Sequence, residues 1–83
     1  MKVNVLGTGC AKCNKLYALA EDAISATGVT AELSKVEKID EIANYGVAFT
    51  PALVVDGEVK SAGKLPTVEK ISEWLRAAGQ PSA

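Results

Sequence analysis

The feature that most limits what this chain can fold into is its pair of cysteines, which lie three residues apart between a strand pattern and a helix pattern. Cys10 and Cys13 are the only cysteines among 83 residues. Residues 2–6 alternate between polar and apolar side chains, which predicts a β-strand, and a flexible glycine-containing turn follows over residues 7–9. From Cys10 onward, apolar residues recur at helical spacing as far as Gly28, a residue type that commonly ends a helix. The sequence therefore predicts a strand–turn–helix unit with Cys10 at the opening of the helix.

A second strand and a short helix are predicted next. Residues 30–36 show strand-like alternation. Ile39, Ile42 and Tyr45 then recur at three-residue spacing, which predicts a short helix ended by Gly46.

The second half of the chain predicts a hairpin and a last helix. Asp56-Gly57 separates the apolar run of residues 52–55 from residues 58–60, and such a pair between two strand patterns is a strong hairpin signal. Thr67 is a suitable N-cap for the last helix. The apolar stripe of this helix has four members: Val68, Ile71, Leu75 and Ala78.

These elements predict one α/β domain. Their order is β-α-β-α-β-β-α, and two strands joined through a helix are expected to be parallel neighbours. With the hairpin added, we expect a four-stranded mixed sheet flanked by three helices, on both of its faces. We expect this domain to span residues 1–79, with a flexible tail over residues 80–83.

Composition and charge exclude several classes of function. The net charge is -1 and no cluster of lysine or arginine occurs, so we expect no nucleic-acid binding. No apolar run has the length of a membrane span and the first residues lack a signal-peptide pattern, so we expect no membrane contact and a cytoplasmic location. The absence of histidine removes Cys–His and Ser–His–Asp catalysis and mixed Cys/His metal sites.

The predicted geometry gives the two sulfurs unequal roles. Unpaired N–H groups at a helix start and the positive end of the helix dipole favour a thiolate at Cys10, and Lys12 adds positive potential. A free thiol has a pKa of about 8.5, and such environments lower it to roughly 3.5–7.5. Cys10 is then expected to attack a substrate disulfide, and the more buried Cys13 to resolve the mixed disulfide.

Three other interpretations of the cysteine pair stay open. A structural disulfide across so short a loop would restrain the unfolded chain little. Two thiolates on a strand-to-helix loop also suit a soft metal, so binding or delivery of Cu(I) or Zn by the same sulfurs is the alternative function. The third interpretation is a redox-inactive adaptor that keeps the fold. We assign no residue to metal binding and expect no cofactor.

A second motif, Thr50-Pro51-Ala52-Leu53, leads into the first strand pattern of the hairpin. With Cys10-Ala11-Lys12-Cys13 upstream and Ser61-Ala62-Gly63 downstream, the chain resembles the thioredoxin/glutaredoxin superfamily. More narrowly, it resembles the small glutaredoxin-like proteins known as small redox-active disulfide proteins. The resemblance also includes Tyr45-Gly46-Val47 and covers about residues 2–78.

The resemblance implies a thioredoxin-like fold and a thiol–disulfide oxidoreductase that carries electrons as a disulfide reductase. Cys10 and Cys13 are its catalytic residues. The peptide bond between Thr50 and Pro51 is implied to be cis and to face the sulfur pair, with the backbone of Thr50 offered to an extended substrate.

The residues around the cysteines depart from the commonest thioredoxin pattern. Gly9 stands where thioredoxins carry tryptophan, and Ala11 and Lys12 stand where they carry Gly-Pro. We assign these three residues a supporting role. Thioredoxins also bury an acid in the strand before the motif, whereas Asn4 and its neighbours supply none.

The resemblance also implies a binding surface and partners. Ala62 and Gly63 fall where glutaredoxins place a glycine pair that lets glutathione or a peptide approach, so both are assigned to substrate binding. The implied partners are a thioredoxin-reductase-like electron donor, target disulfide proteins and, as a further candidate, glutathione. We expect a monomer.

Overall fold

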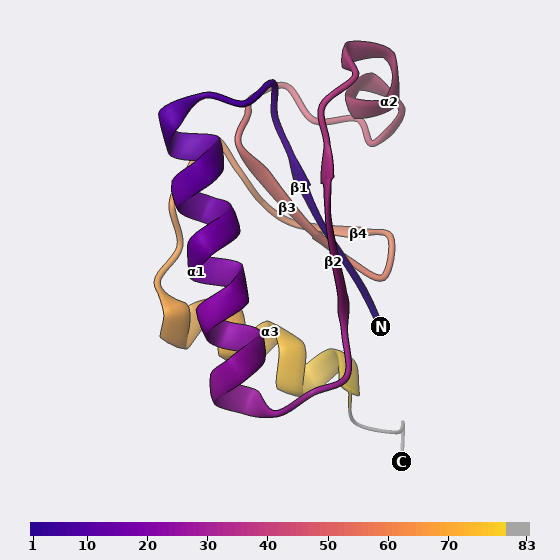
Figure 1. Cartoon of the computed structure of the whole chain (residues 1–83). Helices are drawn as coiled ribbons and strands as arrows, with labels where there is room; N and C mark the ends of the chain where they lie inside the picture. The colour runs from indigo at the N-terminus through magenta and orange to yellow at the C-terminus, as the bar shows by residue number, and fades with distance from the viewer. Residues whose placement is uncertain (80–83) are drawn as a thin grey trace.

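The computed structural model describes residues 1–79, and their elements follow the predicted order (Figure 1). The elements are β1 (Lys2–Leu6), α1 (Ala11–Thr27), β2 (Glu32–Val36), α2 (Ile39–Asn44), β3 (Ala52–Val55), β4 (Glu58–Ala62) and α3 (Val68–Gly79). The predicted tail over residues 80–83 lies outside the described residues. Within residues 1–79, no helix combines the length and the apolar character that crossing a membrane requires.

The strands form one mixed sheet in the order β2-β1-β3-β4. β1 and β2 are parallel, as predicted for strands joined through a helix, and β3 runs antiparallel to both of its neighbours. The hairpin turns at Asp56 and Gly57, whose φ angles of 48° and 83° are the positive values that an Asp-Gly turn adopts. β4 continues past the predicted residues 58–60 and pairs Ala62 with Ala52. The end of the hairpin therefore lies beside the start of β3.

Each face of the sheet buries its own apolar set because strand side chains alternate between faces. Val3 and Val5 pack with α1 and α3, whereas Leu6 packs on the opposite face against Ile42 of α2. The helices contribute five fully buried residues to the first face: Leu16, Ala20, Ala23, Ile71 and Leu75. Helices thus cover both faces, as predicted, with α1 and α3 together on one face and α2 on the other (Figure 1).

Two local predictions are wrong, and each concerns the end of an element. β2 begins at Glu32, later than the predicted start at residue 30. The short helix predicted from the spacing of Ile39, Ile42 and Tyr45 is present as α2, although Ile39 is 74% exposed and does not share the buried face of Ile42. Ala78 is also exposed, so the apolar stripe of α3 ends at Leu75. Helical spacing gives the direction of a side chain, but it does not show whether the sheet extends far enough to cover the end of the helix.

α1 has the predicted limits at both ends. Cys10 is its N-cap, and Gly28 is its C-cap. Gly28 has a φ of 70°, the left-handed conformation that lets its N–H reach the carbonyl of Ile24 at 3.0 Å. These limits place Cys10 at the junction between sheet and helix.

Candidate redox site

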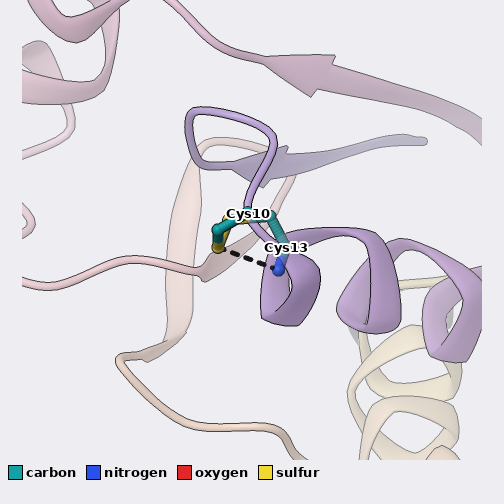
Figure 2. Close-up of a disulfide and its surroundings, with 2 residues drawn as sticks. All are labelled: Cys10 and Cys13. Atoms are coloured by element: carbon teal, nitrogen blue, oxygen red, sulfur yellow. Dashed lines mark hydrogen bonds between the residues drawn. A yellow bond between two sulfur atoms is a disulfide. The ribbon is translucent and has the colours of Figure 1, made fainter.

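Cys10 caps α1 with its sulfur. Its backbone is extended, with φ −69° and ψ 166°, and its carbonyl accepts a hydrogen bond from the N–H of Asn14 at 3.0 Å. Its sulfur accepts a hydrogen bond from the N–H of Cys13 at 3.2 Å (Figure 2). Ser, Thr or Asp ordinarily supplies an oxygen at this position. In this chain the sulfur takes that place at the positive end of the α1 dipole.

Cys13 lies in the first turn of α1 and forms a disulfide with Cys10, with their Cα atoms 5.0 Å apart (Figure 2). Cys13 is 5% exposed, whereas Cys10 is exposed. A partner molecule can therefore approach Cys10, while Cys13 is covered by the protein. This difference confirms the prediction that Cys13 is the more buried cysteine.

The start of α1 favours negative charge. Its first turn carries no acidic side chain, and Ala11 and Lys12 between the cysteines are both exposed. A carboxylate here would oppose a thiolate, whereas a lysine favours one. The charges within the first turn of α1 thus favour a thiolate at Cys10 once the disulfide is reduced. One carboxylate lies near this turn on another segment, since an oxygen of Glu37 is 3.6 Å from where a Cβ on Gly9 would be.

Gly9 connects β1 to this helix start. It is exposed, and its φ of 86° lies in the region that L side chains rarely adopt. The structure therefore favours a supporting role in which Gly9 allows the backbone turn that places Cys10 at the N-cap of α1.

The peptide bond between Thr50 and Pro51 is cis, as the resemblance implies. Pro51 is fully buried, and Thr50 is exposed. A Cβ built on Gly7 would overlap the sulfur of Cys13 and would lie 4.0 Å from the Cα of Pro51. The structure therefore brings Pro51 beside Cys13, although the two residues are far apart in the sequence.

Gly63 supports the loop that carries this proline. Its N–H donates a hydrogen bond to the carbonyl of Pro51 at 2.8 Å, and its φ is 74°. A Cβ at Gly63 would lie 2.9 Å from the Cβ of Phe49. Ala62 is half-buried and pairs with Ala52. These contacts are internal to the protein, so the assignment of Ala62 and Gly63 to substrate binding stays a prediction.

Two features of the site leave little trace in the sequence. The sequence pattern places Gly7 in a flexible turn, whereas in the structure Gly7 is buried against Cys13. Asn4, in the region where thioredoxins bury an acid, donates its amide N–H to the hydroxyl of Tyr45 at 3.2 Å and accepts a hydrogen bond from Ser34 at 2.7 Å. An amide does not titrate, so Asn4 cannot accept the proton of Cys13. For Gly7, the sequence shows only that a glycine directly follows the first strand pattern.

Within residues 1–79, no group of three or more histidine, cysteine, aspartate or glutamate side chains is placed to hold a metal ion.

The family model that matches this chain describes a thioredoxin domain, and the match covers residues 1–76. The chain belongs to the thioredoxin family. A protein named thioredoxin from Methanothermobacter thermautotrophicus is 39% identical over 75 residues, which cover 90% of this chain and 97% of that protein. A thioredoxin from Methanocaldococcus jannaschii is also 39% identical over 75 residues, which cover 90% of this chain and 86% of that protein.

Family membership and the disulfide-bonded CxxC pair together establish the activity. The chain is a thiol–disulfide oxidoreductase, a disulfide reductase of the thioredoxin type. The predicted superfamily, fold and reaction class are confirmed. The narrower resemblance to small glutaredoxin-like proteins stays a prediction.

Proposed function

We propose that Cys10 is the attacking nucleophile and Cys13 the resolving cysteine of a reductase that acts on protein disulfides. The observation that carries this assignment is that Cys10 is exposed at the N-cap of α1 while Cys13 is buried one turn inside it. A helix start stabilises the thiolate form of the attacking sulfur. Burial protects the resolving sulfur from outside disulfides, so its nearest target is the mixed disulfide on Cys10.

The proposed cycle moves two electrons from the protein to its substrate. The Cys10 thiolate attacks one sulfur of the substrate disulfide, that bond breaks, and the other substrate sulfur leaves as a thiolate. Cys13 then loses its proton and attacks the Cys10 sulfur, which releases the second substrate thiolate and forms the internal disulfide. A reductase returns the protein to the dithiol form through the same exchange in reverse.

The substrate platform in this proposal is the exposed backbone at Thr50 beside the buried Pro51. Phe49, the preceding residue, is 69% exposed and adds apolar surface to the same loop. An extended substrate segment can form backbone hydrogen bonds with such an edge while its disulfide faces Cys10.

The thioredoxin relatives imply a reductase and target proteins as partners in general terms. We propose in addition a thioredoxin-reductase-like donor and glutathione as a candidate small-molecule partner. The cytoplasm is the proposed compartment because the first residues show no signal-peptide pattern. In that compartment structural disulfides are rare, and a close cysteine pair is more often catalytic or metal-binding. A single domain over residues 1–79 acting as a monomer completes the proposal.

Reduction of a protein disulfide by Cys10→Ser and Cys13→Ser variants, each supplied with several reductases, tests the assignment. We expect Cys10→Ser to be inactive, because serine cannot form the mixed disulfide. We expect Cys13→Ser to accumulate a mixed disulfide on Cys10 that a gel without reductant detects. Full activity of Cys10→Ser, or trapping through Cys13 in that variant, would contradict the roles.

A Cu(I) titration of the reduced protein against a competing chelator distinguishes the alternative function. Tight one-to-one binding without disulfide-reductase activity would favour metal delivery. Reductase activity that Cys10→Ser abolishes would favour the redox assignment.

A further inference from the structure

Gly7 lies between the end of β1 and the turn before Cys10, and it is buried. A Cβ built on Gly7 would overlap the Cys13 sulfur, and it would lie 3.1 Å from the Cys13 Cβ. Gly7 is not among the glycines with positive φ, so its backbone conformation is open to any residue. The requirement for glycine at this position therefore comes from the Cys13 side chain.

Neither the backbone at Gly7 nor the Cys13 sulfur can move easily to relieve this contact. The N–H of Gly7 donates to the carbonyl of Val36 at 3.0 Å, which ties it to the end of β2. The Cys13 sulfur is bonded to Cys10, and the Cys13 N–H is hydrogen-bonded to the Cys10 sulfur at 3.2 Å. In the disulfide form, the Cys13 sulfur thus has one position, and Gly7 leaves that position free.

We propose that Gly7 is a positioning residue for the resolving sulfur, and that any side chain at position 7 shifts the protein toward its dithiol form. A reduced cysteine can change its χ1 rotamer and move its sulfur away from a new Cβ, whereas a disulfide-bonded cysteine cannot. The added methyl group therefore destabilises the oxidised form more than the reduced form. The inference rests on the proposed resolving role of Cys13 only where it concerns the rate of resolution.

Equilibration of Gly7→Ala with a glutathione redox buffer tests the proposal. We expect the equilibrium constant for forming the internal disulfide to fall at least tenfold, which corresponds to about 30 mV. Release of a preformed mixed disulfide on Cys10 should slow as well, because Cys13 no longer rests in its attacking position. The rate at which Cys10 is alkylated in the reduced protein should stay unchanged.

Gly79→Ala is the matched control. Gly79 also lacks a positive φ, and a Cβ there would meet the flexible end of the Met1 side chain at 3.3 Å, away from the cysteines. This variant should keep the wild-type redox equilibrium. A Gly7→Ala equilibrium constant equal to that of Gly79→Ala would overturn the proposal.

Introducing Gly7→Ala into a protein that lacks the Cys13 sulfur distinguishes an effect on the position of that sulfur from a general effect on folding. The loss of unfolding free energy caused by Gly7→Ala should be much smaller in a Cys13→Ala background, where the 3.1 Å contact with the Cys13 Cβ and the 4.0 Å contact with the Pro51 Cα remain but the overlap with the sulfur is gone. This comparison also decides the case in which Gly7→Ala alone does not fold, since Cys13→Ala should then restore folding. An equal loss in both backgrounds would show that the Cys13 sulfur is not what requires glycine.

Failure of Cys13→Ser to trap a mixed disulfide would instead contradict the proposed role of Cys13 and leave the glutathione equilibrium as the test of Gly7.

Discussion

The backbone N–H of Cys13 donates a hydrogen bond to the sulfur of Cys10 at 3.2 Å, across the first turn of α1. The turn that begins the helix thus also supplies the donor that would stabilise charge on the sulfur proposed to attack the substrate. No acidic side chain in that turn opposes it. The reactivity proposed for Cys10 therefore follows from where α1 begins.

Lys12→Glu should slow the first chemical step. A negative charge beside Cys10 raises the pKa of its thiol and opposes the helix dipole, which contributes about 0.3–1 kcal/mol for one exposed charge. The alkylation rate of reduced Cys10 by a neutral reagent at neutral pH should fall several-fold. Lys15→Glu makes the same charge change about one turn further along α1 and should have a smaller effect. Equal slowing by both variants would show that net charge, and not the helix start, controls Cys10.

Gly63→Ala should cost more stability than Gly57→Ala. Both glycines have positive φ, 74° and 83°, so alanine meets a backbone cost of roughly 1–2 kcal/mol at each. Only at Gly63 would the new Cβ also meet Phe49, at 2.9 Å, since the space around Gly57 is open. Denaturant unfolding measures the difference. Equal losses of unfolding free energy in the two variants would mean that the contact with Phe49 does not add to the cost of Gly63→Ala.

The same Gly63→Ala variant should weaken substrate binding, because the loop held by the Gly63–Pro51 hydrogen bond carries the proposed platform at Thr50. We expect KM for a protein disulfide to rise more than kcat falls. A wild-type KM would argue against a platform at Thr50.

Ile42→Ala and Ile39→Ala should differ sharply although both residues belong to α2. Ile42 is 8% exposed and packs against Leu6 and Val54, so its truncation should cost about 2–5 kcal/mol. Ile39 is 74% exposed, and its truncation should change the unfolding free energy by less than about 0.5 kcal/mol. Urea unfolding of the two variants checks the position of α2 on the sheet, and similar losses would contradict it.

Tyr45→Phe should destabilise the protein by about 0.5–1.5 kcal/mol, because Asn4 then loses one hydrogen-bond partner. Tyr17→Phe is the matched control, since none of the side-chain hydrogen bonds within residues 1–79 involves the Tyr17 hydroxyl. Thermal or urea unfolding of both variants measures the difference. If Tyr45→Phe loses no more unfolding free energy than Tyr17→Phe, the hydrogen bond between Asn4 and Tyr45 does not contribute to stability.

The parts of this fold that follow from local sequence were predictable. The hairpin at Asp56-Gly57 and the helix limits at Cys10 and Gly28 each depend on a few adjacent residues. The asymmetry of the two cysteines follows from the same local geometry. The role of Thr50 and Pro51 came from the resemblance, and the cis bond agrees with it.

Contacts between distant segments were not predictable from the pattern. Gly7 reads as a turn residue until Cys13 and Pro51 are brought beside it by the folding of α1 and β3. The hydrogen bonds of Asn4 join β1 to Ser34 in β2 and to Tyr45 after α2. The exposure of Ile39 depends on how far the sheet extends, which residue spacing along the helix does not encode.

Titration of the Cys10 thiol by thiolate absorbance, in reduced Cys13→Ser, tests the central claim most directly. The same variant unfolded in denaturant provides the ordinary thiol value, about 8.5. A lowered pKa would stabilise the folded reduced protein fully above the unfolded thiol value, and this stability would decline as the pH falls and be lost through the lower, folded-state pKa. We predict a pKa in the folded protein clearly below that of the unfolded chain. A folded-state pKa equal to or above the unfolded value would contradict the account, because the N-cap position of Cys10 would then not activate its sulfur.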